Sequence, residues 1–237
     1  MKNLGVIGGL GPMATAYFLE LIVKMTDVKK DQEHLPVTLL SRPDIPDRTA
    51  FILGESDKSP LPDIINYAKT LESLDASCIA IPCITSHYFY SEFAKSVKIP
   101  VINIVAETAA YLKSLDIKKV GIMATSGTIA TKLFQNALQK EGIEFEIPDE
   151  ENQKKVMHLI YDNVKAGIPV EMKLFDEVSK KLREKGCECI ILGCTELSLI
   201  KRDYNIAKGY LDALEVLAMA SVLCCDMPLR EEYKNLL

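Results

Sequence analysis

The sequence predicts an α/β protein built from two similar lobes, each a parallel sheet flanked by helices. Short apolar runs alternate with longer stretches of helical pattern along the whole chain, and two sequence segments recur in the same order. Strands covered by helices on both faces read as continuous apolar runs, because neither face meets water. The expected strands are residues 4–7, 37–40, 78–81, 101–104, 120–124 and 189–192.

Helical patterning fills the intervals between these strands. It covers residues 14–26, 62–74, 107–115, 129–140, 153–166 and 170–185. A last helix, over residues 210–225, has no counterpart after the first half of the chain and is expected to cross back onto that half. The predicted division is a first lobe of residues 1–105 plus 210–237 and a second lobe of residues 106–209.

An internal repeat is the strongest indication that the two lobes are related. Residues 4–15 align with residues 120–131 at an offset of 116, and Gly5 thereby matches Gly121. Residues 78–83 align with residues 189–194 at an offset of 111, and Cys83 thereby matches Cys194. Two copies in one order and at nearly one offset indicate two lobes of the same architecture.

Charge and hydropathy exclude several classes of protein. The net charge is -5 and the basic residues are scattered, which argues against a nucleic-acid partner. No apolar run approaches the roughly 18 residues that a membrane helix requires, and glycines interrupt the first apolar run where a signal peptide would lie. We therefore expect a cytoplasmic protein that has neither a nucleic-acid nor a membrane partner, and whose seven cysteines are thiols.

Two of the cysteines lie where a ligand is expected. Cys83 and Cys194 each follow the carboxyl end of an expected strand, and ligands bind at that edge of open parallel sheets. If the lobes face each other, the two thiols meet across the cleft between them. Each is followed by an expected helix start, which would lower the pKa of the thiol.

Two thiols on opposite sides of a small molecule suit proton transfer at one carbon. One thiolate removes the Cα proton from one face, and the other thiol delivers a proton to the opposite face, so that the stereocentre inverts without a cofactor. A single buried cysteine is more often a small apolar residue of the core. The remaining cysteines fit that alternative, and none of their spacings is typical of a metal site.

Three motifs resemble those of the aspartate/glutamate racemase family. They are GGLGPMAT at residues 8–15, PCITSH at residues 82–87 and GCTEL at residues 193–197, and together they cover essentially the whole chain in order. The Gly-Cys-Thr-Glu sequence is similar to the aspartate racemase branch. The resemblance implies a cleft active site between two α/β lobes, no pyridoxal phosphate, a homodimer, and racemisation of an acidic amino acid, with aspartate first and glutamate second.

The resemblance also implies which residues hold the substrate. Arg48 and Lys165 match family positions that would bind carboxylates. From the residues alone, Arg48 also fits a surface arginine after a turn, and Lys165 also fits a cation at a helix C-terminus. Hydroxyl and backbone N–H groups that would bind the α-carboxylate are expected from Thr85, Thr128 and Thr195. Supporting roles are expected for Gly11, whose backbone could approach a ligand closely, and for Glu196 beside Cys194.

One position departs from the family. The residue after the first cysteine is usually an asparagine that helps to hold the substrate, and here it is Ile84. Loss of that polar contact leaves two alternatives open: a racemase of another amino acid, and a bilobed small-molecule binding protein without turnover. His87, four residues after Cys83, fits either a structural histidine or a group that tunes the thiol.

Overall fold

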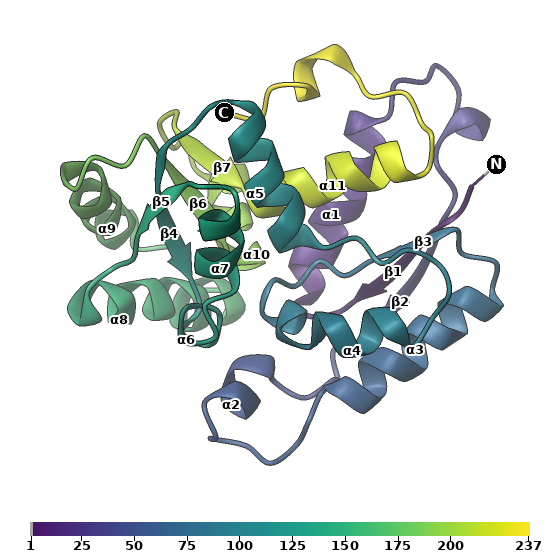
Figure 1. Ribbon diagram of the computed structural model, residues 1–237, viewed down its shortest axis with the longest axis horizontal. Coiled ribbons are helices and arrows are strands. Elements are labelled where there is room, and N and C mark those ends of the chain that lie inside the picture. The colour runs from purple at the N-terminus through teal and green to yellow at the C-terminus, as the bar shows by residue number, and fades with distance from the viewer. Residues whose placement is uncertain (1) are drawn as a thin grey trace.

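The computed structural model describes residues 2–237, which contain two separate parallel sheets (Figure 1). The first sheet has the strand order β2-β1-β3 and the second the order β5-β4-β6-β7. The strands are β1 (Leu4–Gly8), β2 (Val37–Ser41), β3 (Cys78–Ala80), β4 (Lys119–Ala124), β5 (Glu144–Glu146), β6 (Cys189–Gly193) and β7 (Tyr210–Asp212). The predicted fold class, an α/β protein with two parallel sheets flanked by helices, is confirmed.

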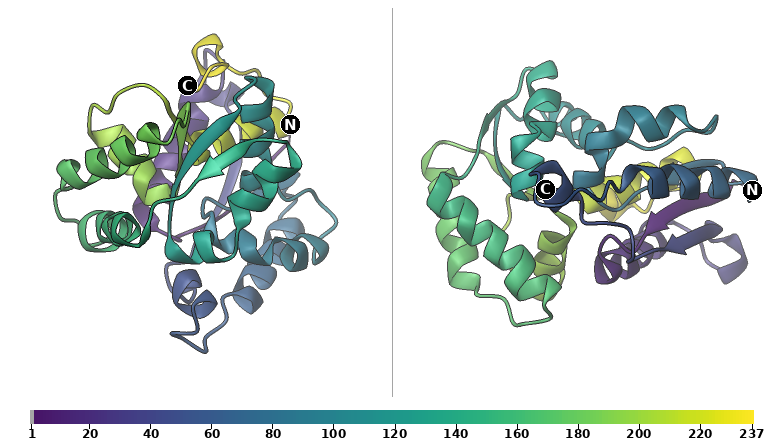
Figure 2. Two further views of the ribbon diagram at one scale, coloured as in Figure 1. Left: turned by 60° about the vertical axis from the view of Figure 1, so that its left-hand side comes forward. Right: turned by 90° about the horizontal axis from the view of Figure 1, so that it is seen from below.

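Helices flank both sheets, as the two further views show (Figure 2). They are α1 (Pro12–Met25), α2 (Arg48–Ile52), α3 (Leu61–Ser73), α4 (Tyr90–Lys95), α5 (Ile104–Ser114), α6 (Ser126–Ala130), α7 (Leu133–Lys140), α8 (Glu150–His158), α9 (Met172–Glu184), α10 (Thr195–Asp203) and α11 (Ala213–Cys224), with 3₁₀ turns η1 (Asp31–Glu33), η2 (Thr85–Phe89) and η4 (Glu231–Tyr233), and a π-helical segment η3 (Leu159–Lys165). Among the described residues, no helix is both long and apolar enough to cross a bilayer.

The internal repeat corresponds to the same strand pairing in both lobes. Leu4 pairs with Cys78 at the start of the β1–β3 ladder, and Val120 pairs with Cys189 at the start of the β4–β6 ladder. The sequence alignment matches Leu4 with Val120 and Cys78 with Cys189. Because the register is shared, β3 and β6 present their carboxyl ends, and the residues that follow, at equivalent places in the two lobes.

The repeated glycines Gly5 and Gly121 let a helix lie close against each sheet. A Cβ atom on Gly5 would come within 3.2 Å of the Leu71 Cβ on α3, and one on Gly121 within 3.1 Å of the Leu182 Cβ on α9. Such contacts are tighter than ordinary packing allows, so a side chain here would push the helix outward. α3 and α9 each lead into the strand that precedes one of the two cysteines, and this close packing therefore helps to fix where those strands lie.

Several elements differ from the expectation. The expected strand at residues 101–104 is reduced to a single bridge between Val101 and Ile79, since Ile104 already begins α5. The expected helix at residues 129–140 is broken at Lys132, which adopts the left-handed conformation with φ of 56°. The short strands β5 and β7 were not predicted, because three residues carry too little periodicity to separate them from a loop or a helix.

The C-terminal segment links the two lobes. The expected division assigned residues 210–237 to the first lobe, but Tyr210–Asp212 form β7 and pair with β6 in the second sheet. α11 then passes to α1 and α5, and Figure 1 shows it between the sheets. We propose that the second lobe extends to Asp212, and that α11 and the residues after it belong with the first lobe.

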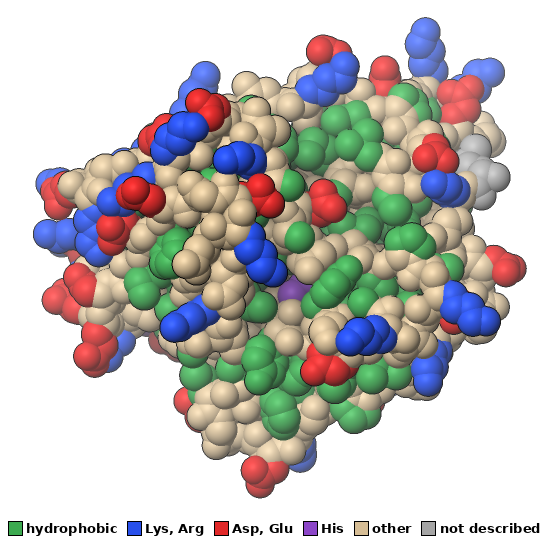
Figure 3. Space-filling view, in the orientation of Figure 1, with side chains coloured by type: hydrophobic (Ala, Val, Ile, Leu, Met, Phe, Trp, Pro, Cys, Tyr) green, Lys and Arg blue, Asp and Glu red, His purple; other side chains and the backbone are tan. Residues whose placement is uncertain are grey.

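Charges are mixed on the molecular surface. On the face shown in Figure 3, Lys and Arg side chains alternate with Asp and Glu side chains around the edge of the molecule. Several surface ion pairs join residues one turn apart on the same helix, such as Lys154 with Glu150 on α8 and Lys24 with Glu20 on α1. Exposed pairs of this kind contribute little to stability.

Candidate active site

Cys83 and Cys194 line one small buried cavity between the two lobes. Cys83 lies just beyond β3 and is 5% exposed, whereas Cys194 directly follows β6, caps the N-terminus of α10 and is 6% exposed. The cavity also receives Arg48 from the first lobe and Lys165 from the second. Two sheets with matching registers therefore direct one thiol each toward a shared space.

The thiol of Cys194 is held by a carboxylate from its own helix. Its Sγ donates a hydrogen bond to Oε2 of Glu196 at 2.9 Å, and both side chains are buried. Burial in the protein interior, and then the charge of Glu196, raise the pKa of the Cys194 thiol well above its ordinary value. The expected lowering by the helix N-terminus is wrong for Cys194, because these two effects outweigh the helix dipole.

Lys165 holds the same carboxylate from the other side. Its Nζ lies 2.7 Å from Oε1 of Glu196 and 5.4 Å from the centre of the Tyr161 ring. Burial is the largest single influence and would lower the pKa of Lys165, but the charge and hydrogen bond of Glu196 together with the nearby Cys194 and Cys83 raise that pKa overall. Lys165 and Tyr161 are carried by η3, the π-helical segment, and such segments often occur at functional sites.

Because Gly11 has no side chain, there is room beside it for the Glu196 carboxylate. A Cβ atom at this position would lie 3.1 Å from Oε1 of Glu196. Gly11 has φ of -101° and ψ of 161°, an extended conformation open to any residue, so its backbone does not require glycine. The absence of a side chain therefore matters here for the space beside the carboxylate.

Arg48 is a buried residue rather than a surface arginine after a turn. It is 8% exposed, and its guanidinium donates hydrogen bonds to the carbonyl oxygens of Leu10, Ile45 and Pro46 at 3.1–3.3 Å. Its Nε has no hydrogen-bond partner among the described residues. Burial works to lower the pKa of Arg48, but the neighbouring Cys83 and Asp47 outweigh it and raise that pKa. Arg48 thus places a fixed positive charge beside Cys83.

Three threonine hydroxyls join the lobes beside the cavity. Thr85 Oγ1 lies 3.1 Å from Thr125 Oγ1 and 3.0 Å from Thr128 Oγ1, and the latter two lie 3.1 Å apart. Of these, Thr85 and Thr125 line the cavity itself. Thr195 lines it too, and its hydroxyl donates to Oε2 of Glu196 at 3.4 Å. These hydroxyls can reorient to bind a ligand oxygen.

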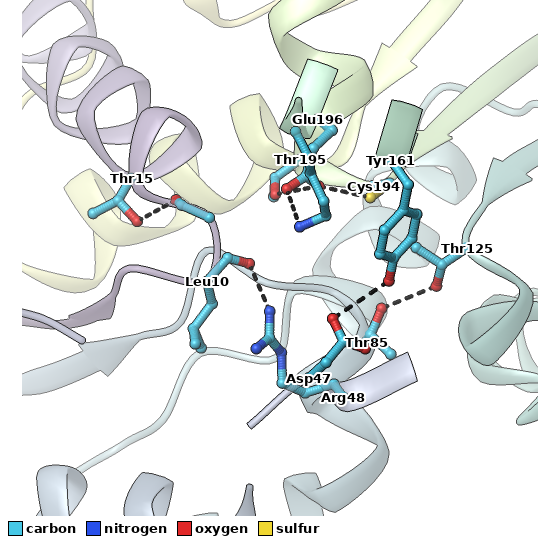
Figure 4. Close-up of polar contacts among 12 residues, drawn as sticks. Leu10, Thr15, Asp47, Arg48, Thr85, Thr125, Tyr161, Cys194, Thr195 and Glu196 are labelled. Atoms are coloured by element: carbon cyan, nitrogen blue, oxygen red, sulfur yellow. Dashed lines mark hydrogen bonds and ion pairs between the residues drawn. The ribbon is translucent and has the colours of Figure 1, made fainter. Parts of the chain in front are cut away.

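Five residues of the cavity were not singled out in the sequence: Leu10, Asp47, Thr49, Thr125 and Tyr161. Asp47 and Tyr161 come from different lobes, and the Tyr161 hydroxyl donates to Oδ2 of Asp47 at 3.5 Å (Figure 4). Burial raises the pKa of Tyr161 to about 12. Thr125 follows β4, so its place at the carboxyl end of a strand could have identified it, and Tyr161 lies one helical turn before Lys165.

His87 and Ile84 are both buried, His87 against backbone carbonyl groups and Ile84 in the apolar core. The Nδ1 of His87 lies 2.9 Å from the carbonyl oxygen of Cys83, and its Nε2 lies 3.3 Å from the carbonyl oxygen of Ile102. His87 therefore contacts the backbone at Cys83, and burial lowers its pKa. Ile84 is 2% exposed, lines the cavity and packs in the apolar core between the lobes.

A wider pocket leads to the cavity from the surface. The inner cavity has a volume of about 20 Å³, whereas the outer pocket has about 380 Å³, and both are lined by Asp47, Arg48, Lys165 and Glu196. One water molecule needs a cavity of about 10–15 Å³, so the inner cavity has room for little more than one. An amino acid reaches the thiols only if these charged side chains move apart.

The described residues offer no cluster for a metal ion, since no group of three or more His, Cys, Asp or Glu side chains converges within them. The groups that do converge on the cavity are two thiols, two cations, two carboxylates and a set of hydroxyls. They can bind a carboxylate and exchange protons with a carbon acid held between the thiols.

Fold and cavity together define a bilobed α/β protein with a thiol on each side of its cleft. Residues 7–220 match the model of the Asp/Glu/hydantoin racemase family, and the chain belongs to this family. The prediction of an amino-acid racemase, an isomerase, is thereby confirmed.

Individual relatives agree over nearly the full length. An aspartate racemase of Picrophilus torridus has 32% identity and a TM-score of 0.84, over 99% of this chain and 98% of that one. The broad-specificity amino-acid racemase RacX of Bacillus subtilis is 25% identical over 92% of this chain and 96% of its own. A glutamate racemase of Bacillus anthracis, 14% identical with a TM-score of 0.64 over 92% of this chain and 79% of that one, shares the fold.

Proposed function

We propose that this protein racemises a small amino acid by a two-base mechanism in which Cys83 and Cys194 act on opposite faces of Cα. The observation that carries the proposal is that both thiols line one interlobe cavity together with Arg48 and Lys165. One thiolate removes the Cα proton, and the other thiol protonates the opposite face. The thiols supply both the acceptor and the donor, so the mechanism needs no cofactor.

The two cations lower the barrier to proton removal. Loss of the Cα proton moves negative charge onto the carboxylate, where a positive charge stabilises it most strongly away from water. Arg48 is held by three backbone carbonyls and is positioned in advance. Lys165 is held by Glu196 in the closed cavity, and a substrate carboxylate would compete with Glu196 for it.

Hydroxyl groups would orient the substrate between the thiols. Thr85 and Thr195 line the cavity from opposite lobes, and Thr128 holds Thr85 through its own hydroxyl. A substrate carboxylate that accepts hydrogen bonds from these groups would lie with its Cα between the sulfurs, since Cys83 precedes Thr85 by two residues and Cys194 directly precedes Thr195. Glu196 keeps the Cys194 thiol in place until then.

The substrate predicted from the motif resemblance is aspartate first and glutamate second. A second candidate is an amino acid with an uncharged side chain, because Ile84 gives one wall of the inner cavity an apolar surface. The outer pocket adds Met13, Ile45, Val164 and Leu199. A family member named as a broad-specificity racemase is compatible with either candidate. The homodimer and the cytoplasmic location remain predictions.

Solvent exchange distinguishes racemisation from binding without turnover. Each enantiomer of aspartate, glutamate and a panel of neutral amino acids is incubated with the protein in heavy water and followed by proton NMR and chiral chromatography. We expect early product of the inverted enantiomer to carry deuterium at Cα, while the remaining substrate keeps its proton. Absence of exchange for every amino acid of the panel would support the bilobed binding protein instead.

Single replacements test the two-base step. In Cys83→Ser and Cys194→Ser the hydroxyl is a much weaker acid and base than the thiol, so racemisation should fall by at least about 1,000-fold in each variant. The matched control is Cys187→Ser, which replaces another buried cysteine that lies away from the cavity. Racemisation that survives in either active-site variant would contradict two thiol bases.

A further inference from the structure

Two cysteines outside the cavity are in sulfur–sulfur contact. The Sγ atoms of Cys78 and Cys225 lie 3.5 Å apart, although the residues are 147 positions apart in the sequence. Cys78 is the first residue of β3, and Cys225 is the residue that ends α11. Their exposed fractions are 0% and 2%. Neither residue lines the active-site cavity, so the proposed racemisation gives this contact no role.

We propose that Cys78 and Cys225 form an oxidation site, in which a hydroperoxide converts the two thiols to a disulfide that ties α11 to β3. The contact joins the C-terminal helix to the sheet that leads to Cys83. The reaction is independent of the proposed racemisation, because it involves no residue of the cavity.

The surroundings of Cys225 favour its thiolate. The hydrogen-bonded contact with Cys78 lowers the pKa of the Cys225 thiol against the opposing effect of burial, and the positive charge of Lys2 lowers it further. Lys2 is held close by, since its Nζ donates to the carbonyl oxygen of Cys224 at 2.9 Å and pairs with Oδ2 of Asp226 at 2.9 Å. The pKa of Cys78 is raised, first by its hydrogen bond with Cys225. Either sulfur can donate this hydrogen bond, but Lys2 lies at the Cys225 end of the pair, so we assign the nucleophile to Cys225 and the proton to Cys78.

The chemistry balances in two steps. The Cys225 thiolate attacks one peroxide oxygen, so that an S–O bond forms, the O–O bond breaks, and the second oxygen leaves and takes up a proton. The Cys78 sulfur then attacks the Cys225 sulfenic acid, which forms the S–S bond and releases water with the Cys78 proton. With hydrogen peroxide, two thiols and one peroxide give one disulfide and two waters.

Disulfide formation requires the two sulfurs to come closer and a peroxide to reach Cys225. A disulfide bond is about 2.0 Å long, so its formation requires the sulfurs to close a gap of about 1.5 Å. Cys225 lies where the helix stops, just before Asp226 with φ of 56°. The adjacent Cys224 is partly exposed, so the end of the helix that carries Cys225 lies at the molecular surface.

The experiment is peptide mapping of the full chain after treatment with hydrogen peroxide. Remaining thiols are blocked, and the protein is digested with trypsin without reduction. Cleavage after Lys69, Lys95, Lys208 and Arg230 leaves residues 70–95 on one peptide and residues 209–230 on the other, so the crosslink appears as their sum less two hydrogens. Fragment spectra then assign the link to residues 78 and 225, which distinguishes it from one through Cys83 or Cys224.

Matched variants make the outcome decisive. The link should be lost in Cys225→Ser and in Cys78→Ser, and retained in Cys224→Ser and in Cys187→Ser. Oxidised wild type should also unfold at least about 3 °C higher than reduced protein, with reversal by dithiothreitol and no such shift in Cys225→Ser. A link between Cys78 and Cys224, a link between Cys224 and Cys225, or a sulfinic acid on Cys225 without any crosslink would overturn the proposal.

Discussion

Lys165 Nζ lies 2.7 Å from Oε1 of Glu196, and the other oxygen of that carboxylate accepts the thiol hydrogen of Cys194 at 2.9 Å. One carboxylate thus holds a cation and a thiol of the cavity at the same time. The two proposed bases are therefore not equivalent, since Cys194 lies beside a negative charge and Cys83 beside the positive charge of Arg48. The two lobes share one architecture, but different charges lie beside the two thiols.

Glu196→Gln should lower the pKa of Cys194. The replacement removes a negative charge that disfavours the thiolate, so the thiolate forms at lower pH. Alkylation of Cys194 by iodoacetamide, quantified by peptide mass spectrometry, should show its midpoint at lower pH than in wild type. Racemisation should fall by about 10-fold or more, because Lys165 and the thiol lose a charged partner.

The matched control for Glu196→Gln is Glu146→Gln. Glu146 pairs with Lys119 at 3.0 Å on the surface of the second lobe, away from the cavity. This variant should leave both the alkylation midpoint of Cys194 and the racemisation rate unchanged. An unchanged midpoint in Glu196→Gln would show that burial alone sets the pKa of Cys194.

Gly11→Ala should impair racemisation more than stability. Its backbone conformation accepts alanine, but the added Cβ would lie 3.1 Å from Oε1 of Glu196 and displace the carboxylate. We expect kcat/KM to fall by about 10-fold, with a change in unfolding free energy within about 1 kcal/mol, as urea denaturation measures it. A fully active Gly11→Ala would mean that Glu196 tolerates a shift.

Arg48→Lys should lower both activity and stability. Lysine keeps the charge but cannot donate in the directions of the guanidinium, so the carbonyls of Leu10, Ile45 and Pro46 lose partners. The expected loss is about 1–3 kcal/mol in urea unfolding, together with at least about 10-fold in kcat/KM. Wild-type kinetics in Arg48→Lys would exclude Arg48 from substrate binding.

Ile84→Asn should favour aspartate over amino acids with apolar side chains. An amide in the cavity wall offers hydrogen bonds to a polar side chain and removes apolar surface. The ratio of kcat/KM for aspartate to that for a neutral amino acid should rise by about 10-fold or more. Ile84→Val is the control and should leave the ratio as in wild type. If the ratio in Ile84→Asn equals that of wild type, Ile84 does not determine specificity.

Because Asp212 holds a proton in the folded state, the free energy of unfolding should fall as pH rises from about 4 to 7. Burial, and then the charge of Glu215, raise its pKa to about 7, so the folded state keeps a proton that the unfolded state has already released. A group that binds more protons when folded stabilises the fold at low pH, and this contribution is lost as pH rises through 7. Urea denaturation between pH 4 and pH 8 should show the decline.

Asp212→Asn isolates this effect. Asparagine can still accept hydrogen bonds from Ser198 Oγ and the Leu214 N–H, but it carries no charge. Its unfolding free energy relative to wild type should improve from pH 5 to pH 8 by on the order of 2–4 kcal/mol. A constant difference across this range would show that Asp212 does not titrate there.

The local sequence determined the elements and their repetition. Apolar runs of Val, Ile and Leu specify buried strands by composition, and two aligned segments placed Cys83 and Cys194 at equivalent strand ends. These features depend on residues that are neighbours in the chain, which is why they could be predicted. β7 could not, because its pairing with β6 depends on a partner strand distant in sequence.

Only the tertiary structure determined which side chains of the site contact one another. The contact of Lys165 with Glu196, the hydrogen bond from Arg48 to the carbonyl oxygen of Leu10, and the bond between Tyr161 and Asp47 all join distant segments. Their energies depend on distance and on exclusion of water, and neither quantity is encoded in a local pattern. The sequence therefore predicted two thiols in one cleft, and the packing of the lobes determined that one lies beside a carboxylate and the other beside an arginine.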